Sequence, residues 1–416
     1  MTIDAQRIYD RCQALAAHSE QHDGLTRVFL SPEQRAVNAL VLGWMRDAGM
    51  TARLDAIGNC VGRYEGTVAD APCLMLGSHL DTVRDAGKYD GMLGVVAAIE
   101  CVAALDREGT RLPFAVEVVG FADEEGVRFG ATLLGSRAVA GTFDAKALDA
   151  VDANGMSMRD ALAGSGLDAG RIADAARRAG DVLAYAELHI EQGPVLESLG
   201  ASVGVVTAIN GGNRFVVDIG GMAGHAGTVP MRLRRDALAA AAECVLAIEA
   251  AAQARSDVVA TVGKLEAAPG AVNFIPGHVR FTLDVRAPTD VARIEAAKSI
   301  REACEAIARR RGVTWSIEPL WEASTAACES ALQRQFAAAV EGEGLPVHVL
   351  PSGAGHDGMA IISIAPIGML FIRCKHGISH NPAEAVDVAD VDDGARVLLR
   401  FIRNFVSRSD GASVMR

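Results

Sequence analysis

Short apolar runs that end in polar residues are the clearest pattern in the first half of the chain. Residues 73–76 form one such run, which Gly77-Ser78 ends, and residues 114–122 and 183–190 form two more. Each has the length and composition of a buried strand. A helical pattern that extends to about residue 108 separates the first run from the second. The pattern predicts an α/β sheet whose strands are joined by helices.

Three further segments add elements to this prediction. Residues 4–19 and 31–50 carry apolar residues at helical spacing, and Ser31-Pro32-Glu33 is typical of a helix N-terminus. Residues 51–64 favour a β-hairpin with its turn near Gly58-Asn59. Residues 133–180 are rich in Ala and Gly and predict only short helical pieces.

The pattern changes near residues 207–212. The following segments predict the order strand, helix, strand, strand, helix, strand, over residues 214–220, 234–254, 257–265, 279–286, 290–311 and 313–320. This order is typical of a ferredoxin-like domain. We therefore expect residues 208–320 to be inserted into a larger α/β domain made of residues 1–207 and 321–416.

Length and composition narrow the class of protein. A chain of 416 residues is too long for one ordinary core, which agrees with two domains. Its apolar runs are much shorter than the roughly 20 residues of a membrane helix, and its start predicts no secretion signal. A net charge of −12 without a basic block argues against nucleic acid as a partner. Eight cysteines without a CxxC pair favour a reducing compartment, so we expect a cytoplasmic protein.

Residues with metal-binding side chains follow all three apolar runs. His79, Asp81 and Asp90 come after the first run, Glu124-Glu125 after the second, and His189 lies at the end of the third. Ligand sites of α/β sheets lie at the carboxyl ends of the strands. Because His79 and Asp81 are two positions apart, they share a face of an extended chain, and Asp81 can orient the imidazole.

Each of these residues has an ordinary explanation when taken alone. A single histidine is more often a surface or core residue, Glu124-Glu125 is typical of a solvated turn, and Asp90 beside Gly91 is typical of a turn or a helix cap. Their shared position after apolar strands favours a metal site, because an uncompensated charge there would be costly. Together with His380, the set suits two divalent ions about 3.5–4 Å apart. We expect Zn²⁺, with Mn²⁺ or Co²⁺ as alternatives.

Glu124 and Glu125 have different predicted roles. Adjacent side chains of an extended backbone point to opposite sides. One carboxylate can then bind metal while the other accepts a proton from the attacking water.

The motifs GSHLDTV, KYDGMLGVV, DEEGVRF, HIEQGPVLE, GHAGTVPM, GAGHDG and GISHNPAE stand in this order along the chain. Together they resemble the amidase, hydantoinase/carbamoylase family of the dinuclear metallo-aminopeptidase-like superfamily, over about residues 25–405. The resemblance implies a mixed-sheet α/β/α catalytic domain with an inserted ferredoxin-like lid and dimerisation domain. It also implies that His79, Asp90 and His189 bind the first metal, and that Glu125 and His380 bind the second. In this scheme Asp90 bridges the metals, Glu124 is the general base and Asp81 orients His79.

The same resemblance suggests which residues bind the substrate. Gln192, His225, Asn273 and Arg286 match positions that hold a ureido group and a carboxylate, and His356 lies near the site. The planar guanidinium of Arg286 suits a bidentate carboxylate clamp. In the family the residue at His225 is supplied across a dimer interface and can stabilise an oxyanion.

For three of these residues, a structural role is the alternative to substrate binding. Arg286 can instead pair with Asp284 on the same face of its strand. His225 can be a surface loop residue, and His356 can be a buried hydrogen-bonding residue.

The reaction implied by the resemblance is metal-assisted hydrolysis of an amide-like C–N bond. Its substrate is a small ureido carboxylate: an N-carbamoyl-L-amino acid, 3-ureidopropionate, allantoate or ureidoglycolate. The stretches DEEGVRF and LLGSRAVAG slightly favour allantoate. An aminoacylase or dipeptidase is the alternative enzyme, disfavoured by HIEQG and GAGHD. A metal-free binding protein on the same scaffold is the alternative from another class.

Overall fold

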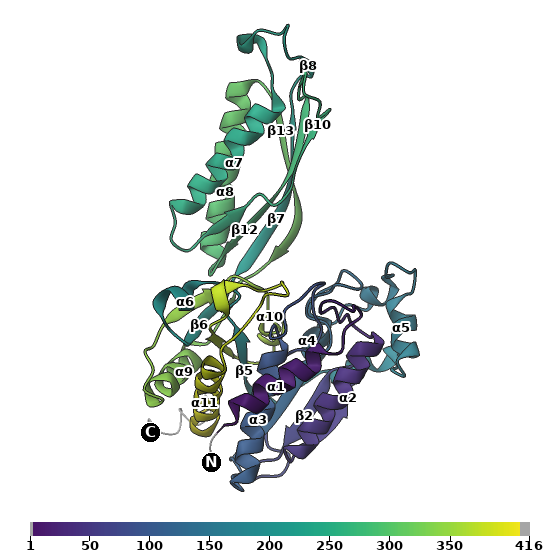
Figure 1. The fold of residues 1–416 in the computed structure, drawn as a ribbon, viewed down its shortest axis with the longest axis vertical. Helices are drawn as coiled ribbons and strands as arrows, with labels where there is room; N and C mark the ends of the chain where they lie inside the picture. The colour runs from purple at the N-terminus through teal and green to yellow at the C-terminus, as the bar shows by residue number, and fades with distance from the viewer. Residues whose placement is uncertain (1–2, 408–416) are drawn as a thin grey trace. The chain divides into compact units, whose positions relative to one another are not determined.

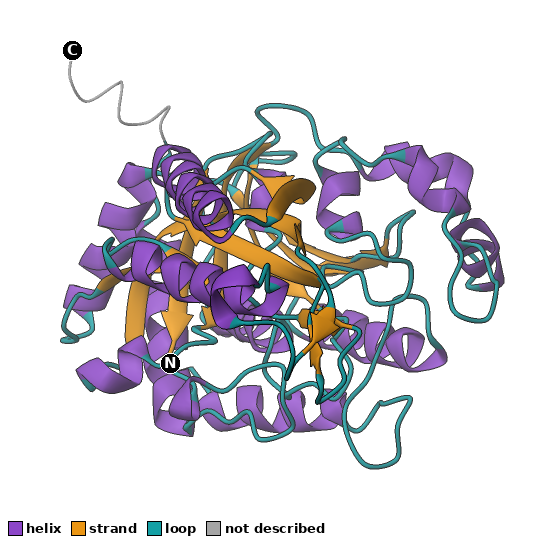
Figure 2. Ribbon diagram, turned by 90° about the horizontal axis from the view of Figure 1, so that it is seen from above, coloured by secondary structure: helices purple, strands orange, loops and turns teal. Residues whose placement is uncertain are grey.

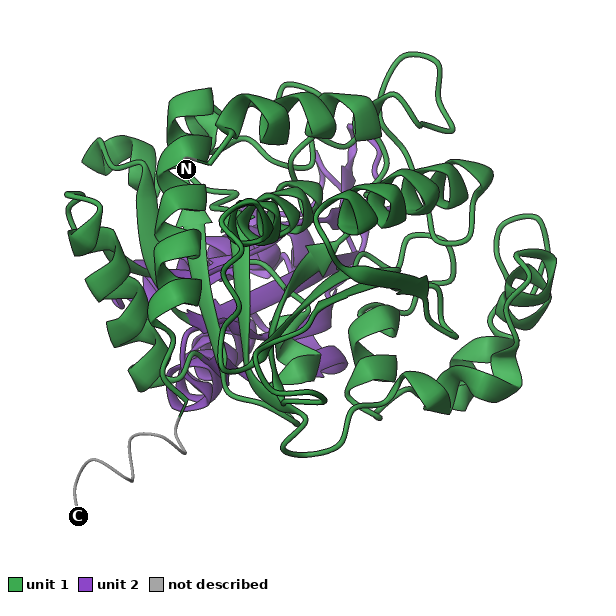
Figure 3. Ribbon diagram, turned by 90° about the horizontal axis from the view of Figure 1, so that it is seen from below, with its two compact units in different colours: residues 1–207, 328–350, 354–416 green, residues 208–327, 351–353 purple. Residues whose placement is uncertain are grey.

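The computed structural model describes residues 3–407, which form two compact units (Figure 3). Unit 1 consists of the described parts of residues 1–207, 328–350 and 354–416, and unit 2 of residues 208–327 and 351–353. The predicted boundaries at 1 and 416 lie outside the described residues. Unit 2 extends past residue 320 because its last long strand continues to Ala323.

A mixed sheet of nine strands forms the centre of unit 1. Its order is β1-β2-β4-β3-β5-β16-β6-β14, and β15 pairs with β6. Figure 1 labels β2, β5 and β6 of this sheet. The strands are β1 (Thr51–Leu54), β2 (Cys60–Tyr64), β3 (Cys73–His79), β4 (Ala115–Phe121), β5 (Val182–Ile190), β6 (Val203–Ile209), β14 (Ala326–Ala327), β15 (Val349–Ser352) and β16 (Ile367–Ile372). Because β4, β3, β5 and β16 are parallel neighbours, their carboxyl ends meet at one edge. The predicted α/β class and the hairpin β1–β2 are confirmed.

Five long helices share one hydrophobic core with this sheet: α1 (Ala5–Ala16), α2 (Pro32–Asp47), α3 (Met92–Arg107), α9 (Ser330–Gly342) and α11 (Val388–Asn404). Figure 2 shows helices beside the strands. The predicted start of α2 is confirmed, since Ser31 Oγ accepts the amide of Gln34 and Pro32 is the first helical residue. No helix in residues 3–407 is long and apolar enough to cross a membrane.

Short helices fill the connections of unit 1. The predicted short helices between residues 133 and 180 are present as α4 (Leu134–Val139), η1 (Ala145–Asp149), α5 (Met158–Gly164) and η2 (Ala169–Ala175). Three more lie in later loops: α6 (Val195–Leu199), α10 (Gly358–Ile361) and η4 (Lys375–Gly377).

Unit 2 contains an antiparallel sheet of order β10-β12-β7-β13, with β9 also paired to β12, and helices α7 and α8. Its elements are β7 (Gly211–Gly220), β8 (Gly224–His225), η3 (Met231–Leu233), α7 (Ala237–Gln253), β9 (Val259–Thr261), β10 (Leu265–Ala268), β11 (Phe274–Ile275), β12 (His278–Ala287), α8 (Asp290–Arg311) and β13 (Thr314–Ala323). The role of this unit as a ferredoxin-like lid stays a prediction.

The prediction of one strand over residues 257–265 is wrong. The chain forms two strands there, β9 and β10, which pair with different stretches of β12. Between them the hydroxyl of Thr282 accepts the amide of Lys264 at 3.1 Å. A side chain thus replaces a backbone acceptor and interrupts the ladder.

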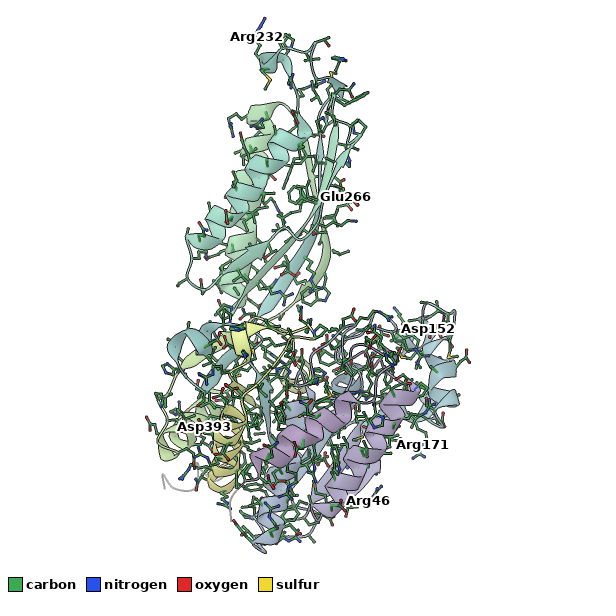
Figure 4. All side chains as sticks on the ribbon, in the orientation of Figure 1. Arg46, Asp152, Arg171, Arg232, Glu266 and Asp393 are labelled. Carbon is green, nitrogen blue, oxygen red and sulfur yellow. The ribbon has the colours of Figure 1, made fainter. Side chains whose placement is uncertain are left out.

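Some charged side chains project from the outside of each unit. In Figure 4 Arg46, Arg171 and Asp393 project from unit 1, and Glu266 and Arg232 from unit 2. Arg232 belongs to η3, at the same end of unit 2 as the small sheet of β8 and β11.

Candidate metal centre

Four parallel strands deliver the candidate ligands to one edge of the unit 1 sheet. His79 is the last residue of β3, Glu125 follows β4, and His189 lies near the end of β5. The loop after β16 carries His380. Among residues 3–407, four groups of potential ligand atoms form there, each within 4.8 Å. Two of them share Asp90: His79, Asp90 and His189, and Asp90, Glu125 and His380.

Asp90 belongs to both groups and directs one carboxylate oxygen to each. Its Oδ1 lies 3.5 Å from Nε2 of His79 and 3.2 Å from Nε2 of His189. Its Oδ2 lies 3.2 Å from Nε2 of His380, which in turn lies 3.4 Å from Oε1 of Glu125. This is the arrangement expected of a carboxylate that bridges two cations.

Backbone carbonyl groups orient the two buried imidazoles. Nδ1 of His79 lies 3.0 Å from the carbonyl oxygen of Asp81, and Nδ1 of His189 lies 2.9 Å from that of Ile190. Carbonyl oxygens only accept, so each Nδ1 carries a proton and each Nε2 faces Asp90.

These atoms fit a pair of divalent cations. Asp90 Oδ1 is buried and accepts no hydrogen bond within the described residues. The Nε2 atoms of two imidazoles and the carboxylate converge around it. A divalent cation compensates such a set, and nitrogen with oxygen ligands suits zinc and its neighbours.

The carboxylate of Asp81 holds the loop after β4. Its two oxygens accept the backbone amides of Glu124 and Glu125 at 3.0 and 3.1 Å, and its Oδ1 lies 3.6 Å from Nδ1 of His79. Asp81 therefore reaches His79 mainly through its own carbonyl group, while its side chain positions the two glutamates.

The prediction that Glu124 and Glu125 point apart on an extended backbone is wrong. The chain bends here, and oxygens of both lie within 4.8 Å of each other and of a His79 nitrogen. The bend forms because Asp81 accepts both amides and Asp123 Oδ1 accepts the amide of Gly126 at 3.2 Å. Burial, and then the charge of Glu125, raise the pKa of Glu124 well above its ordinary value.

The segment that follows Asp90 requires a glycine. Gly91 has φ of +74°, and a Cβ there would lie 2.5 Å from ring atoms of His79. Two non-glycine residues of the site, Gln192 and His380, also have positive φ values, of 57° and 53°. Such strained conformations persist where the surrounding structure holds them.

Comparison with known proteins identifies the family. A family model described as Peptidase family M20/M25/M40 matches residues 75–404. The chain belongs to this family. The protein is 43% identical, over 95% of this chain and 97% of the relative, to an N-carbamoyl-L-amino acid amidohydrolase of Geobacillus stearothermophilus. It is 38% identical to an allantoate deiminase of Arabidopsis thaliana, over 95% of this chain and 81% of the relative.

A solved structure extends the similarity to the whole fold of this M20 protein. The crystal structure of an amidase of the hydantoinase/carbamoylase family from Burkholderia multivorans matches with a TM-score of 0.90 and 32% identity. The match covers 96% of this chain and 97% of that one. The resemblance predicted from the motifs is confirmed.

Two residues of the M20 protein that were predicted to bind substrate lie against the centre. Nε2 of Gln192 donates to Asp90 Oδ2 at 2.8 Å, and its buried Oε1 has no partner among the described residues. His356 is buried, with its ring 4.5 Å from that of His189 in an edge-on contact. Burial, and then the charge of His189, lower the pKa of His356 well below its ordinary value. This burial favours the structural alternative for His356.

The other predicted substrate residues belong to unit 2 and lie at opposite ends of it. His225 and Asn273 are neighbours at β8 and β11, where the amide of Ala226 donates to the carbonyl of Asn273 at 2.9 Å. Arg286 lies near the other end of β12, eight residues after His278. At about 3.3 Å per residue, roughly 26 Å of strand separates the two ends.

Arg286 already has polar partners inside unit 2. Its Nε and Nη2 donate to the carboxylate of Asp284 at 2.8 and 3.1 Å, and Nη1 donates to the carbonyl of Gly353 at 2.7 Å. The structural alternative, pairing with Asp284, is therefore present, and the substrate role of Arg286 stays a prediction.

Sequence reasoning missed two buried glutamates beside the centre. Glu187 accepts the hydroxyls of Ser78 and Tyr185 at 2.8 and 2.9 Å, and Glu384 accepts the amides of Tyr89 and Asp90. The signal for Glu187 was a carboxylate inside the apolar run LAYAELHI. Glu384 lies in the motif GISHNPAE, but no local pattern indicates its distant partners.

Proposed function

We propose that the protein is a metal-dependent amidohydrolase that cleaves a ureido C–N bond of a small carboxylate. The bridging position of Asp90, with one oxygen toward each ligand group, carries the proposal. Membership of the M20 family and similarity to named amidohydrolases of N-carbamoyl amino acids and allantoate support it.

His79, Asp90 and His189 would hold one cation, and Asp90, Glu125 and His380 the other. When bound, two such ions lower the pKa of water between them and polarise the scissile carbonyl. Zn²⁺ is the expected ion, and Mn²⁺ or Co²⁺ would suit the same ligands.

Glu124 is the proposed general base. Asp81 holds its backbone amide, and its carboxylate lies beside Glu125 and His79, outside the Asp90 groups. Glu124 accepts the proton of the attacking water and passes it to the departing nitrogen.

The proposed substrate residues require a homodimer. Because His225 and Asn273 are separated from Arg286 by most of β12, one rigid unit 2 cannot bring both ends to one small substrate. We propose that each site uses its own Arg286 for the carboxylate and Gln192 for the ureido group. A partner subunit supplies His225 and Asn273 through the inserted unit, with His225 donating to the oxyanion. Closure of unit 2 as a lid completes the site.

Within the ureido class, the proposed substrate is an N-carbamoyl-L-amino acid or allantoate. The stretches DEEGVRF and LLGSRAVAG slightly favour allantoate. The N-carbamoyl-L-amino acid amidohydrolases among the relatives are 38–43% identical to this chain, and the allantoate deiminases are 38–40% identical. The described cysteines are all free and buried, which supports the proposed cytoplasmic location.

Ammonia release by metal-reconstituted protein tests the function. Allantoate and a panel of N-carbamoyl-L-amino acids are the substrates, and N-acetyl amino acids are followed by their free amine. We expect turnover of ureido compounds only, abolished by a chelator and restored by Zn²⁺ or Mn²⁺. Turnover of the N-acetyl compounds would assign the protein to the aminoacylases instead, and metal-independent turnover would contradict the proposal.

A further inference from the structure

Glu384 joins two ligand segments that are far apart in the sequence. Its side chain is buried, with the residue 4% exposed, in the loop just after His380. Its Oε1 accepts the amides of Tyr89 and Asp90 at 2.8 and 3.1 Å, and its Oε2 accepts the hydroxyl of Ser379 at 2.9 Å. One carboxylate therefore contacts both the segment of Asp90 and the segment of His380.

The same network limits how the Asp90 carboxylate can rotate. The hydroxyl of Ser379 also lies 3.0 Å from Asp90 Oδ2, which accepts from Gln192 as well. Because Glu384 holds the Asp90 backbone and the amide of Gln192 donates to Oδ2, Oδ1 is left to face His79 and His189. The bridging orientation of Asp90 thus depends on contacts outside the ligand set.

Gly87 provides a second, independent sign that Glu384 occupies a defined place. A Cβ at Gly87 would lie 2.0 Å from Cδ of Glu384 and 2.2 Å from its Oε1. The φ angle of Gly87 is not positive, so a left-handed backbone does not explain the glycine. The need for glycine at this position therefore comes from the side chain of Glu384.

We propose that Glu384 is a positioning residue of the metal centre, which holds Asp90 in place against the His380 loop so that both cation sites form together. The inference rests on the proposed function, because it takes these residues as metal ligands. Loss of a residue that supports metal ligands typically weakens metal binding about 10–100-fold.

Zinc binding to the full chain tests this role. Wild type, Glu384→Ala, Glu384→Gln, Ser379→Ala and Gly87→Ala are stripped by a chelator, and zinc affinity and stoichiometry are measured by competition with a coloured chelator. Gly43→Ala is the matched control for Gly87→Ala, because a Cβ at Gly43 meets nothing within 4 Å.

We expect wild type and Gly43→Ala to bind two zinc ions with equal affinity. Glu384→Ala and Gly87→Ala should bind zinc about 10–100-fold more weakly, and excess zinc should restore their turnover. Glu384→Gln should lose less than about tenfold, because its amide oxygen still accepts both backbone amides. Gly87→Ala retains the Glu384 carboxylate. A loss of zinc affinity in this variant therefore results from displacement of that carboxylate and not from loss of its charge.

The inference is overturned if Glu384→Ala and Gly87→Ala bind both ions as tightly as wild type. If Glu384→Ala does not fold, Gly87→Ala and Ser379→Ala decide, and wild-type zinc affinity in both would overturn it. A wild-type chain that binds two zinc ions but cleaves no ureido compound would contradict the substrate proposal and leave this inference standing. A wild-type chain that binds none of Zn²⁺, Mn²⁺ and Co²⁺ would overturn both.

Discussion

The candidate residues of the two units are held in opposite ways. In unit 1, His79, Asp90 and His189 are 2%, 4% and 1% exposed, and backbone or side-chain groups fix their orientation. In unit 2, His225 and Asn273 are exposed at one end of the sheet, on the short strand β8 and just before β11.

This difference has a physical cause. Buried charges and imidazoles are costly without compensation, so protein groups already orient the unit 1 centre before anything binds. Exposed side chains carry no such requirement, although Nδ1 of His225 accepts the amide of Gly227 at 3.1 Å. The centre proposed to carry out the chemistry is thus preorganised, whereas the proposed recognition residues His225 and Asn273 are exposed.

The largest expected effect is at the base in unit 1. Glu124→Gln should lower kcat by about 10²–10⁴-fold while metal content and the melting temperature stay near wild type, because only proton transfer is removed. Steady-state kinetics and metal analysis check this, with Glu65→Gln on the surface as the control. Turnover near that of wild type would refute the assignment.

The next effect tests whether unit 2 residues reach a site of another subunit. His225→Ala should lower kcat by about 10²–10³-fold if His225 supports the oxyanion. Mixing inactive His225→Ala with inactive Arg286→Ala should restore about a quarter of wild-type activity, because half of random dimers contain one intact site of two. Full activity of His225→Ala, or no recovery on mixing, would remove this end of unit 2 from the mechanism.

A smaller effect tests how closely the unit 1 centre is packed. Gly91→Ala should weaken zinc binding by about 10–100-fold, because its Cβ would press on the His79 ring. Gly109→Ala, after the other end of α3, is matched in its positive φ of 65° but has open space around the new Cβ. The control should lose a similar amount of backbone stability, on the order of 1 kcal/mol, and no zinc affinity.

The smallest effect concerns stability within unit 2. Arg311 and Arg310 on α8 hold the pKa of Glu243 on α7 at about 2. Because this pKa is depressed on folding, its stabilisation is present above the unfolded pKa of about 4.3 and is lost as the pH falls through about 2.

Glu243→Gln should therefore destabilise the protein at pH 6 by less than about 1 kcal/mol, since solvent screens such pairs. Its melting temperature should approach that of wild type as the pH is lowered toward 2. Glu249→Gln, on an exposed part of the same helix, is the control. A constant difference between variant and wild type across this pH range would contradict the ion-pair explanation.

Local patterns were sufficient for most elements and for the candidate ligands that follow the three apolar runs. Helix α8 has the predicted bounds, Asp290–Arg311, because Thr289 caps its start and Gly312 ends it in a left-handed conformation. His79, Glu125 and His189 were predicted to lie at the ends of β3, β4 and β5, and they do. This prediction needed only neighbouring residues, because a buried apolar run followed by polar residues is a local signal.

Local patterns failed where a distant group decides the conformation. The bend at Glu124 and Glu125 exists because Asp81, more than 40 positions earlier, accepts both amides. The break between β9 and β10 likewise depends on Thr282 of another strand.

By itself, the sequence determined the family, the α/β class and which side chains reach the carboxyl edge of the sheet, since these follow from periodicity and motifs. Only the tertiary structure decided that Asp90 directs one oxygen to each ligand group and that Glu384 holds it there. It also decided that His225 and Arg286 lie at opposite ends of unit 2. The physical reason is that these relations join residues tens to hundreds of positions apart, and such pairings are set by packing and not by the pattern of any one segment.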